Sequence, residues 1–346
     1  MFTVRDLTAE QVAYIDRVRA GLHRAPLDVR NAAAYYATTL MERGFPVIFG
    51  VGHLAHVTGL RPNVVGTLAA SPSKYYSDFR IAKRSGGSRV ISAPTPALKR
   101  IQEWLHENVT SVVEVHPSCH GFVRGRSIVS NALPHVGTSL VFKLDIKDFF
   151  PSVSRDRVFR TFRRVGYSIT VANLLTDLTT LGGYLPQGAP TSPDLANAAA
   201  AEMDFRLTRL ADARGVVYTR YADDLTFSGE NVGARRTKRA LERIVRDCGF
   251  RPHEKKARYI GRGGRQQVTG IVVNDKVNWP RDRRRWLRQE VYFLRRFGVE
   301  AHLKARGYSG RQYKEFMYGH IYALNSVRPD EAQDHLVALE SVEWPY

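Results

Sequence analysis

The sequence predicts an α+β fold, and three features of its patterning support this class. Residues 1–70 show helical patterning with an alanine-rich stretch from 31 to 41. From Leu140 the apolar period changes to two, and residues 216–228 contain two further short runs of strand type. Trp279-Pro280 then begins an amphipathic helix. Helices at both ends of the chain and a hairpin between them therefore indicate an α+β protein.

The composition is typical of a globular protein with a polyanionic partner. At roughly 150 residues per domain, 346 residues suggest two or three packed units. The chain has 52 Lys and Arg against 33 Asp and Glu, and this net charge of +19 favours nucleic acid over an anionic membrane surface. Cys119 and Cys248 are too few for a disulfide framework or a four-ligand zinc site. With no signal-peptide pattern and no membrane-length apolar run, we expect a cytoplasmic protein without a membrane partner.

In the N-terminal half, local signals predict helices before one strand. Residues 53–60 loosely resemble the start of a helix-turn-helix, but a helical lead-in packed on the main domain is the better interpretation. After the break at 94–96, a helix should run to about Val109, with Thr95 as its N-cap and Pro96 at its first position. A half-buried strand follows, with Leu140, Phe142 and Leu144 on one face and Val141, Lys143 and Asp145 on the other.

The C-terminal half contains a helix, the hairpin and a second pair of strands. Ser192-Pro193 opens a helix that should end near Gly215. The hairpin turns at Ala222-Asp223-Asp224. Residues 265–280 are predicted to form another strand pair, around Asn274-Asp275.

Three carboxylates occupy positions that suit a metal site. Asp145 ends an apolar strand, where an unpaired carboxylate is costly unless it is exposed or bound to metal. Asp223 and Asp224 lie in a tight hairpin, where adjacent like charges raise each other's pKa unless a cation neutralises them. Mg²⁺ prefers carboxylate oxygens. A lone Asp-Asp pair is most often a surface turn, so the neighbouring motifs decide between the two interpretations.

Four motifs surround these carboxylates in a fixed order. They occupy residues 79–91, 143–152, 185–193 and 221–224, and the last reads Tyr-Ala-Asp-Asp. This series resembles the fingers–palm series of reverse transcriptases. Asn131-Ala132-Leu133-Pro134-His135 resembles the Asn-Ala-x-x-His motif of the retron members, and Val268-Thr269-Gly270 resembles their Val-Thr-Gly motif. The sequence Pro-Gln-Gly-Ala-Pro-Thr-Ser-Pro from Pro186 also resembles retrons more than group II introns.

The resemblance implies a right-hand polymerase with fingers, an antiparallel palm sheet and a short helical thumb. The expected parts are a helical N-terminal region over 1–70, fingers over 71–140, a palm over 141–278 and a thumb over 279–346. A further fingers segment is interleaved in the palm at about 155–185.

The resemblance also implies a metal-binding set. Asp145, Asp223 and Asp224 would hold two Mg²⁺ ions, with the Ile146 carbonyl as a further ligand. Of the adjacent pair, Asp223 is the residue more firmly expected to be a metal ligand. Two such ions, ~3.5–4 Å apart, stabilise the attacking and leaving oxygens of a phosphoryl transfer.

The residues expected at the nucleotide are also implied by the resemblance. Lys83 and Arg89 would bind the triphosphate, and Phe150 would be a steric gate against a ribose 2′-hydroxyl, whereas a plain core role suits its neighbour Phe149 better. Either Lys255 or Lys256 would protonate the leaving pyrophosphate. The expected nucleotide-binding set is Lys83, Arg89, Asp148, Phe149, Phe150, Gln187, Lys255 and Lys256.

The expected RNA contacts combine the retron motifs with the basic helix that Trp279-Pro280 begins. Residues 281–314 hold eleven Lys or Arg against three acids, interleaved with aromatic residues, which suits backbone phosphates and stacked bases. The predicted RNA-binding set is Asn131, His135, Val268, Thr269, Gly270, Arg284, Arg285, Arg288, Arg295 and Arg296.

Retron relatives copy part of their own structured noncoding RNA from the 2′-hydroxyl of a guanosine, using deoxynucleoside triphosphates. The product is a branched RNA–DNA called multicopy single-stranded DNA (msDNA). The resemblance implies this function here, with an effector protein in anti-phage defence. Two alternatives remain: another bacterial reverse transcriptase, of the abortive-infection or diversity-generating type, or a protein that serves mainly as a scaffold for an RNA–DNA product and an effector.

Overall fold

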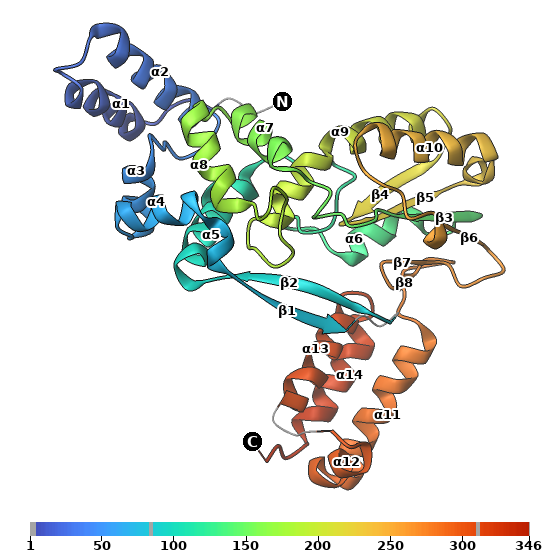
Figure 1. Cartoon of the computed structure of the whole chain (residues 1–346). Coiled ribbons are helices and arrows are strands. Elements are labelled where there is room, and N and C mark those ends of the chain that lie inside the picture. The colour runs from blue at the N-terminus through green and yellow to red at the C-terminus, as the bar shows by residue number, and fades with distance from the viewer. Residues whose placement is uncertain (1–4, 83–85, 309–311, 346) are drawn as a thin grey trace.

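The computed structural model of the chain describes residues 5–82, 86–308 and 312–345, so Lys83 lies outside the described residues. It confirms the α+β class. A central antiparallel sheet has helices on one side, a long β-hairpin extends from the body, and a separate group of helices ends the chain (Figure 1).

The N-terminal region is helical, as predicted. α1 (Ala9–Gly21) begins with a capping box between Thr8 and Gln11, and it packs against α2 (Leu27–Glu42) in a pair that projects from one end of the molecule (Figure 1). α3 (Val51–Thr58) and α4 (Pro62–Ala70) follow, and α4 packs on α8 (Ile169–Thr179) of the main body. The lead-in is therefore packed on the main domain.

The extended hairpin consists of β1 (Tyr76–Ala82) and β2 (Ser88–Pro94), paired antiparallel, and α5 (Pro96–Asn108) follows it. Thr95 is the N-cap of α5, as expected, but its side chain makes no capping hydrogen bond and its hydroxyl is buried without a partner. The fixed φ of Pro96 at the first helical position therefore starts this helix without help from the Thr95 hydroxyl.

The palm sheet has the order β4-β5-β3-β6 and every pairing in it is antiparallel. Its strands are β4 (Val217–Tyr221), β5 (Asp224–Ser228), β3 (Leu140–Asp145) and β6 (Arg258–Gly261). The helices α9 (Ser192–Asp212) and α10 (Arg235–Asp247) cover one face, and α7 (Arg155–Val165) packs on α9 (Figure 1).

The strand β3 is more buried than its alternating pattern predicts. Phe142 and Leu144 are buried, as expected, but Val141 on the opposite face is buried as well. This part of the half-buried prediction was wrong, because the first half of β3 is covered on both faces. Val141 packs with Ala132 and Val268 in a second hydrophobic cluster.

The strand pair expected within 265–280 exists, but its turn is elsewhere. β7 (Gln267–Val268) and β8 (Ile271–Val272) are joined by Thr269 and Gly270, with φ of +47° and +82°. Positive φ at both central residues is the requirement of a type I′ hairpin turn. Asn274, where the turn was expected, instead accepts a hydrogen bond from the Gln266 N–H at 3.0 Å.

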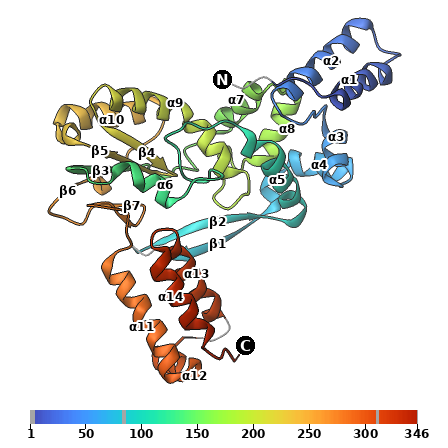
Figure 2. The ribbon, with the colours of Figure 1, turned by 180° about the vertical axis from the view of Figure 1, so that it is seen from behind.

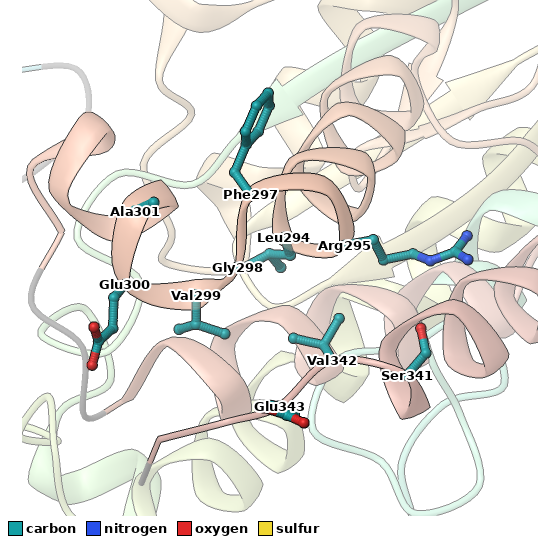
Figure 3. A pocket seen from close by; sticks show the side chains of 10 residues that line it. All are labelled: Leu294, Arg295, Phe297, Gly298, Val299, Glu300, Ala301, Ser341, Val342 and Glu343. Carbon is teal, nitrogen blue, oxygen red and sulfur yellow. The ribbon is translucent and has the colours of Figure 1, made fainter.

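The thumb is a group of four helices seen from behind in Figure 2, namely α11 (Arg281–Phe297), α12 (Val299–Arg306), α13 (Tyr313–Asn325) and α14 (Pro329–Glu340). Leu287 and Leu294 are on the buried face of α11, as its amphipathic pattern requires, and Gly298 is its C-cap. A cavity of about 460 Å³ lies where α11 meets α12, at the end of the thumb away from the palm (Figure 3).

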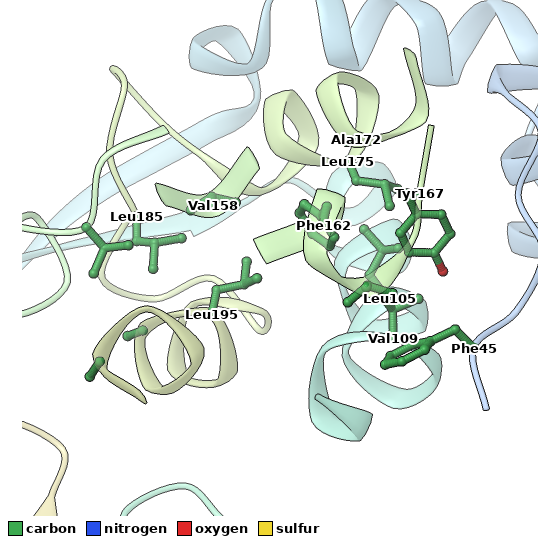
Figure 4. Packing of buried hydrophobic residues seen from close by; sticks show 14 of the residues in the cluster. Phe45, Leu105, Val109, Val158, Phe162, Tyr167, Ala172, Leu175, Leu185 and Leu195 are labelled. Carbon is green, nitrogen blue, oxygen red and sulfur yellow. The ribbon is translucent and has the colours of Figure 1, made fainter. Parts of the chain in front are cut away.

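Two hydrophobic clusters divide the chain. The larger one joins the N-terminal helices, α5, α7 to α10 and the palm sheet, and Figure 4 shows part of it around Phe45, Leu105, Phe162 and Tyr167. The smaller one joins the thumb to Ala132, Val141, Val268 and Ile271. The two retron-like motifs therefore lie at the junction of palm and thumb.

Candidate active site

The palm sheet brings the three predicted carboxylates to one edge. Asp145 is the last residue of β3 and pairs in register with Asp224, the first residue of β5. Ala222 and Asp223 form the turn between β4 and β5. The Ile146 N–H donates to the Asp223 carbonyl at 2.9 Å, which fastens this turn to the end of β3.

The local electrostatics fit a cation site. Burial, together with the nearby Asp145 and Asp224 carboxylates, raises the pKa of Asp223 to about 6. Lys256 faces them: its Nζ lies 2.9 Å from Asp145 Oδ2, and this hydrogen bond raises the pKa of the lysine. Repulsion among the three carboxylates is therefore only partly compensated by the protein.

A hard divalent cation would complete that compensation. In the described part of the chain, no three His, Cys, Asp or Glu side chains are already gathered as closely as ligands of a bound metal would be. The donor chemistry nevertheless fits Mg²⁺, because the available groups are carboxylate oxygens, and burial together with the neighbouring Asp145 and Asp224 charges raises the pKa of Asp223.

The two candidate lysines differ in their placement. Lys255 and Lys256 both line a cavity of about 290 Å³ together with Lys143, Asp145 and Asp224. Among the described residues, only Lys256 of the two forms an ion pair with a carboxylate of the site. Of the two lysines, Lys256 is thus the one that the structure pairs with Asp145.

The segment around Gln187 is attached to the β1–β2 hairpin. The Ser92 N–H donates to the Gln187 carbonyl at 2.8 Å. Gly188 has φ of +126°, and a Cβ there would lie 2.7 Å from Ile91 Cγ2 and 2.9 Å from the Ser92 carbonyl oxygen. The close approach that glycine permits is therefore to β2. Arg89 lies on the same hairpin with its side chain exposed.

Phe149 and Phe150, the aromatic pair after Asp145, differ in burial. Phe149 is only 4% exposed and packs 5.8 Å, centroid to centroid, from Phe250. Its ring therefore belongs to the core, as the plain core role expects. Phe150 is half-buried, and its ring lies 6.2 Å from that of Phe122, which in turn is near Tyr221. Asp148 is exposed with φ of +51°.

Asn131, His135 and Val268, which the retron-like motifs predict to contact RNA, lie inside the protein. All three side chains are fully buried. His135 Nδ1 lies 2.6 Å from Ser228 Oγ and its Nε2 lies 2.8 Å from Thr219 Oγ1, so the ring joins β5 to β4. Burial lowers the pKa of His135 to about 3, which keeps the ring neutral.

The two motifs also touch each other. Thr269 donates from its hydroxyl to the Ile128 carbonyl at 3.0 Å and accepts from Asn131 Nδ2 at 3.4 Å. Gly270 is the exposed member of its motif. The pair of motifs is therefore a structural connection behind the palm, and Leu133, Pro134 and the Thr269-Gly270 turn are the parts of it that reach the surface.

The arginines of α11 fall into two groups. Arg284 and Arg288 form ion pairs with Glu331 of α14, at 2.8 and 3.3 Å. Arg285, Arg295 and Arg296 are exposed, and within the described ranges they form no ion pair. The first group fastens α11 to α14, whereas the second keeps its hydrogen-bond donors available to a ligand.

Sequence reasoning missed Gly121 and Arg220, which lie directly behind the turn. A Cβ on Gly121 would be 2.5 Å from the Ala222 backbone nitrogen. The Arg220 guanidinium donates to the Ala222 carbonyl at 3.1 Å. The signal that could have found Arg220 is a lone arginine inside an otherwise apolar and hydroxylated strand.

Comparison with known proteins agrees with this geometry. Residues 81–280 match the family described as reverse transcriptase (RNA-dependent DNA polymerase). The antiparallel sheet that carries the three carboxylates, together with this match, defines a right-hand RNA-directed DNA polymerase. Within the described ranges, no helix has the length and apolar character needed to span a membrane.

Three curated relatives narrow the class. The retron Mx65 reverse transcriptase of Myxococcus xanthus is 38% identical over 82% of this chain and 67% of its own. The retron Mx162 reverse transcriptase of the same organism is 34% identical over 97% and 76%, and the retron Ec86 reverse transcriptase of Escherichia coli is 31% identical over 76% and 84%. The chain belongs to the retron reverse transcriptases.

Proposed function

We propose that this reverse transcriptase copies part of a structured noncoding RNA, starting from the 2′-hydroxyl of a guanosine in that RNA, and that the product is msDNA. The observation that carries the proposal is the meeting of Asp145, Asp223 and Asp224 at one sheet edge in a chain related to named retron reverse transcriptases. The substrates are deoxynucleoside triphosphates.

The three carboxylates, with the Ile146 carbonyl, would hold two Mg²⁺ ions. The ions would activate the attacking hydroxyl and stabilise the charge on the leaving pyrophosphate. Lys256 holds a positive charge beside Asp145 and is the residue that would give its proton to the pyrophosphate.

The nucleotide would lie between the carboxylates and the β1–β2 hairpin. Arg89, and Lys83 next to the described part of β1, would bind the triphosphate. Phe150 would exclude the ribose 2′-hydroxyl, since its half-buried ring lies in the aromatic group beside Tyr221. Gln187 and Asp148 would complete the contacts.

RNA would be held by the exposed face of α11. Arg285, Arg295 and Arg296 are exposed and form no ion pair with any residue that the structure describes, and Tyr292 is 59% exposed among them. Guanidinium groups bind phosphates, and an exposed ring stacks on bases. In this proposal residues 71–140 with about 155–185 act as fingers, 141–278 as palm and 279–346 as thumb, beyond the helical region 1–70.

The biological setting proposed is a bacterial cytoplasm, where the enzyme and its msDNA act with an effector protein in anti-phage defence. The relationship to retron enzymes supports this setting. The chemistry can be tested without the effector.

The test is to express the chain with its cognate RNA, extract nucleic acid, and compare it with an Asp223→Asn control. The proposal expects DNA joined to RNA through a 2′,5′ bond, which a debranching enzyme releases, and none in the control. Unbranched DNA made from any supplied primer would support another bacterial reverse transcriptase. No DNA from the intact chain would reject the proposal.

A further inference from the structure

We propose that Arg220 is a positioning residue that holds the backbone of the Tyr-Ala-Asp-Asp turn, and with it the Asp223 carboxylate, in its working conformation. The proposal deepens the catalytic part of the proposed function and rests on Asp223 as a metal ligand. Arg220 touches neither substrate nor metal in this account, and it acts through Ala222.

The burial of Arg220 is the first observation. It is 0% exposed, and by volume it is the largest of the fully buried side chains among the described residues. A guanidinium stays charged in proteins, so burying one is costly unless its donors are satisfied. An apolar residue at this position of β4 would be less costly to bury than a guanidinium. The buried charge therefore indicates a role other than packing.

The pairing of Arg220 shows where it is anchored. Its Nε donates to Asp204 Oδ1 at 2.8 Å and its Nη2 donates to Asp204 Oδ2 at 2.7 Å, a bidentate ion pair in which both side chains are fully buried. Asp204 also accepts from the Tyr218 hydroxyl at 2.7 Å. The guanidinium is thus fixed in orientation by α9, a long helix of the main core.

The remaining arm of the guanidinium reaches the turn. Nη1 donates to Asn197 Oδ1 at 2.9 Å and to the Ala222 carbonyl at 3.1 Å. Asn197 and Asp204 are seven residues apart on α9, so two turns of one helix present both anchors on the same side. The turn carbonyl is therefore tied, through one rigid planar group, to the core.

The turn needs such a tie because its backbone is strained. Ala222 has φ of +55°, and it occupies the first central position of a two-residue hairpin, where glycine is preferred. The segment before it is also constrained: the Arg220 N–H donates to the Ser118 carbonyl and the His120 N–H donates to the Arg220 carbonyl, both at 2.7 Å.

Gly121 completes the clamp from the other side. Its missing Cβ would lie 2.5 Å from the Ala222 nitrogen, and its carbonyl accepts from Asn197 Nδ2 at 2.8 Å. Asn197 therefore links the guanidinium to the segment that packs on the turn. A strained backbone conformation persists only where surrounding contacts hold it. The contacts of Arg220, Asn197 and Gly121 hold the positive φ of Ala222.

A merely structural role for Arg220 makes a different prediction from a positioning role. Removing a structural contact lowers the melting temperature and the active fraction but leaves the metal requirement of the remaining active molecules unchanged. Removing a positioning contact moves Asp223, so the Mg²⁺ concentration for half-maximal activity should rise. Partners that orient metal ligands typically affect metal affinity or activity by about 10–100-fold.

The experiment compares Arg220→Lys with Leu241→Ala, a fully buried apolar residue of α10 that serves as the matched destabilised control. Primer extension is measured against Mg²⁺ concentration for each. Lysine keeps the charge beside Asp204 but cannot also reach Asn197 and Ala222. We expect Arg220→Lys to raise half-saturating Mg²⁺ about 10-fold or more, and Leu241→Ala to leave it unchanged.

Two further variants test the same contact, and Gly121→Ala keeps the proposal testable if Arg220→Lys does not fold. Ala222→Gly removes the strain, so combining it with Arg220→Lys should recover part of the Mg²⁺ affinity. Gly121→Ala pushes on the Ala222 nitrogen without disturbing any charge and should raise half-saturating Mg²⁺ by itself. Unchanged Mg²⁺ dependence in folded Arg220→Lys or Gly121→Ala would overturn the proposal.

Asp223→Asn separates this proposal from the one on which it rests. Normal extension by Asp223→Asn would reject the metal-ligand role of Asp223. An inactive Asp223→Asn together with an Arg220→Lys variant that behaves like Leu241→Ala would reject only the positioning role.

Discussion

Two arginines in different regions of this enzyme show how the surroundings assign a role to one residue type. Arg220 in the palm is fully buried, and its guanidinium donates to Asp204, Asn197 and Ala222. Arg285 in the thumb is exposed and forms no ion pair within the described residues. The hydrogen-bond donors of Arg220 are bound to groups of the protein, whereas those of Arg285 are exposed and can bind a ligand.

The same contrast separates the motif residues from the basic helix. His135 and Asn131 are fully buried, although their motif suggested RNA contact. Polar groups behind the palm sheet should therefore affect every substrate alike, and exposed cations on α11 should affect the binding of RNA. The following predictions test this division, from the largest expected effect to the smallest.

Asp223→Asn should lower Mg²⁺-dependent DNA synthesis by several orders of magnitude, since it removes one carboxylate from the proposed metal site. Folding should survive. The folded pKa of Asp223 is raised to about 6, so its ionised form destabilises the fold above that pH, and a neutral side chain relieves this cost. Primer extension and thermal melting at pH 7 check the two parts, and near-normal extension would refute the site.

His135→Ala should destabilise the protein by about 2–4 kcal/mol, because it leaves a cavity and two buried hydroxyls without their partner. Extension of the cognate RNA and of an unrelated primer–template should fall together. Chemical denaturation and paired activity assays measure this. A defect confined to the cognate RNA, with normal stability, would show that the ring contacts RNA after all.

The same residue predicts a pH effect on stability. The pKa of His135 is about 3 in the folded chain, whereas an unperturbed histidine has a pKa of 6.5, so between these values the unfolded chain takes up a proton that the folded chain does not. Stability should therefore decline as the pH falls below about 6.5. His135→Ala should lack this component of the decline.

Phe150→Val should raise the incorporation of ribonucleotides relative to deoxynucleotides by about 10-fold, since a smaller side chain frees space for a 2′-hydroxyl. Competition between matched nucleotide pairs measures the ratio. Phe149→Leu is the control, because that buried ring should alter stability and leave the ratio alone. An unchanged ratio in Phe150→Val would place the selectivity elsewhere.

Arg285→Ala combined with Arg296→Ala should weaken RNA binding and lower its salt dependence, by about 0.7–0.9 in slope for each phosphate that is no longer bound. Arg284→Ala combined with Arg288→Ala is the matched control, since these two arginines are paired with Glu331. Binding titrations from low to moderate salt distinguish the pairs. Equal slopes for both double variants and the wild type would argue that α11 does not hold phosphates.

The sequence was sufficient to predict that carboxylates meet at one sheet edge, because ordered motifs place Asp145 beside Asp224 in any chain that forms this sheet. It could not show which motif residues face inward. A short polar motif reads the same whether His135 bonds to Ser228 or to RNA. The partner of Arg220 was hidden for a similar reason, since Asp204 is 16 residues upstream on a different element.

The position of the turn between β7 and β8 could not be predicted from the sequence either. Asn274-Asp275 is the better turn signal by residue type, yet the chain turns at Thr269-Gly270. The choice depends on tertiary packing, because Val268 and Ile271 on either side of that turn are both buried in the cluster between palm and thumb. Shifting the turn by a few residues would expose them.

The half-saturating Mg²⁺ concentration for primer extension, measured from pH 5 to pH 8, tests most directly whether the carboxylates at the hairpin form the metal site. Asp223 has a pKa of about 6 without metal, so protons compete with the cation below that pH. We predict a constant value above about pH 7 and a rise approaching about 10-fold per pH unit below pH 6. A half-saturating concentration that does not change from pH 5 to pH 7 would contradict the assignment.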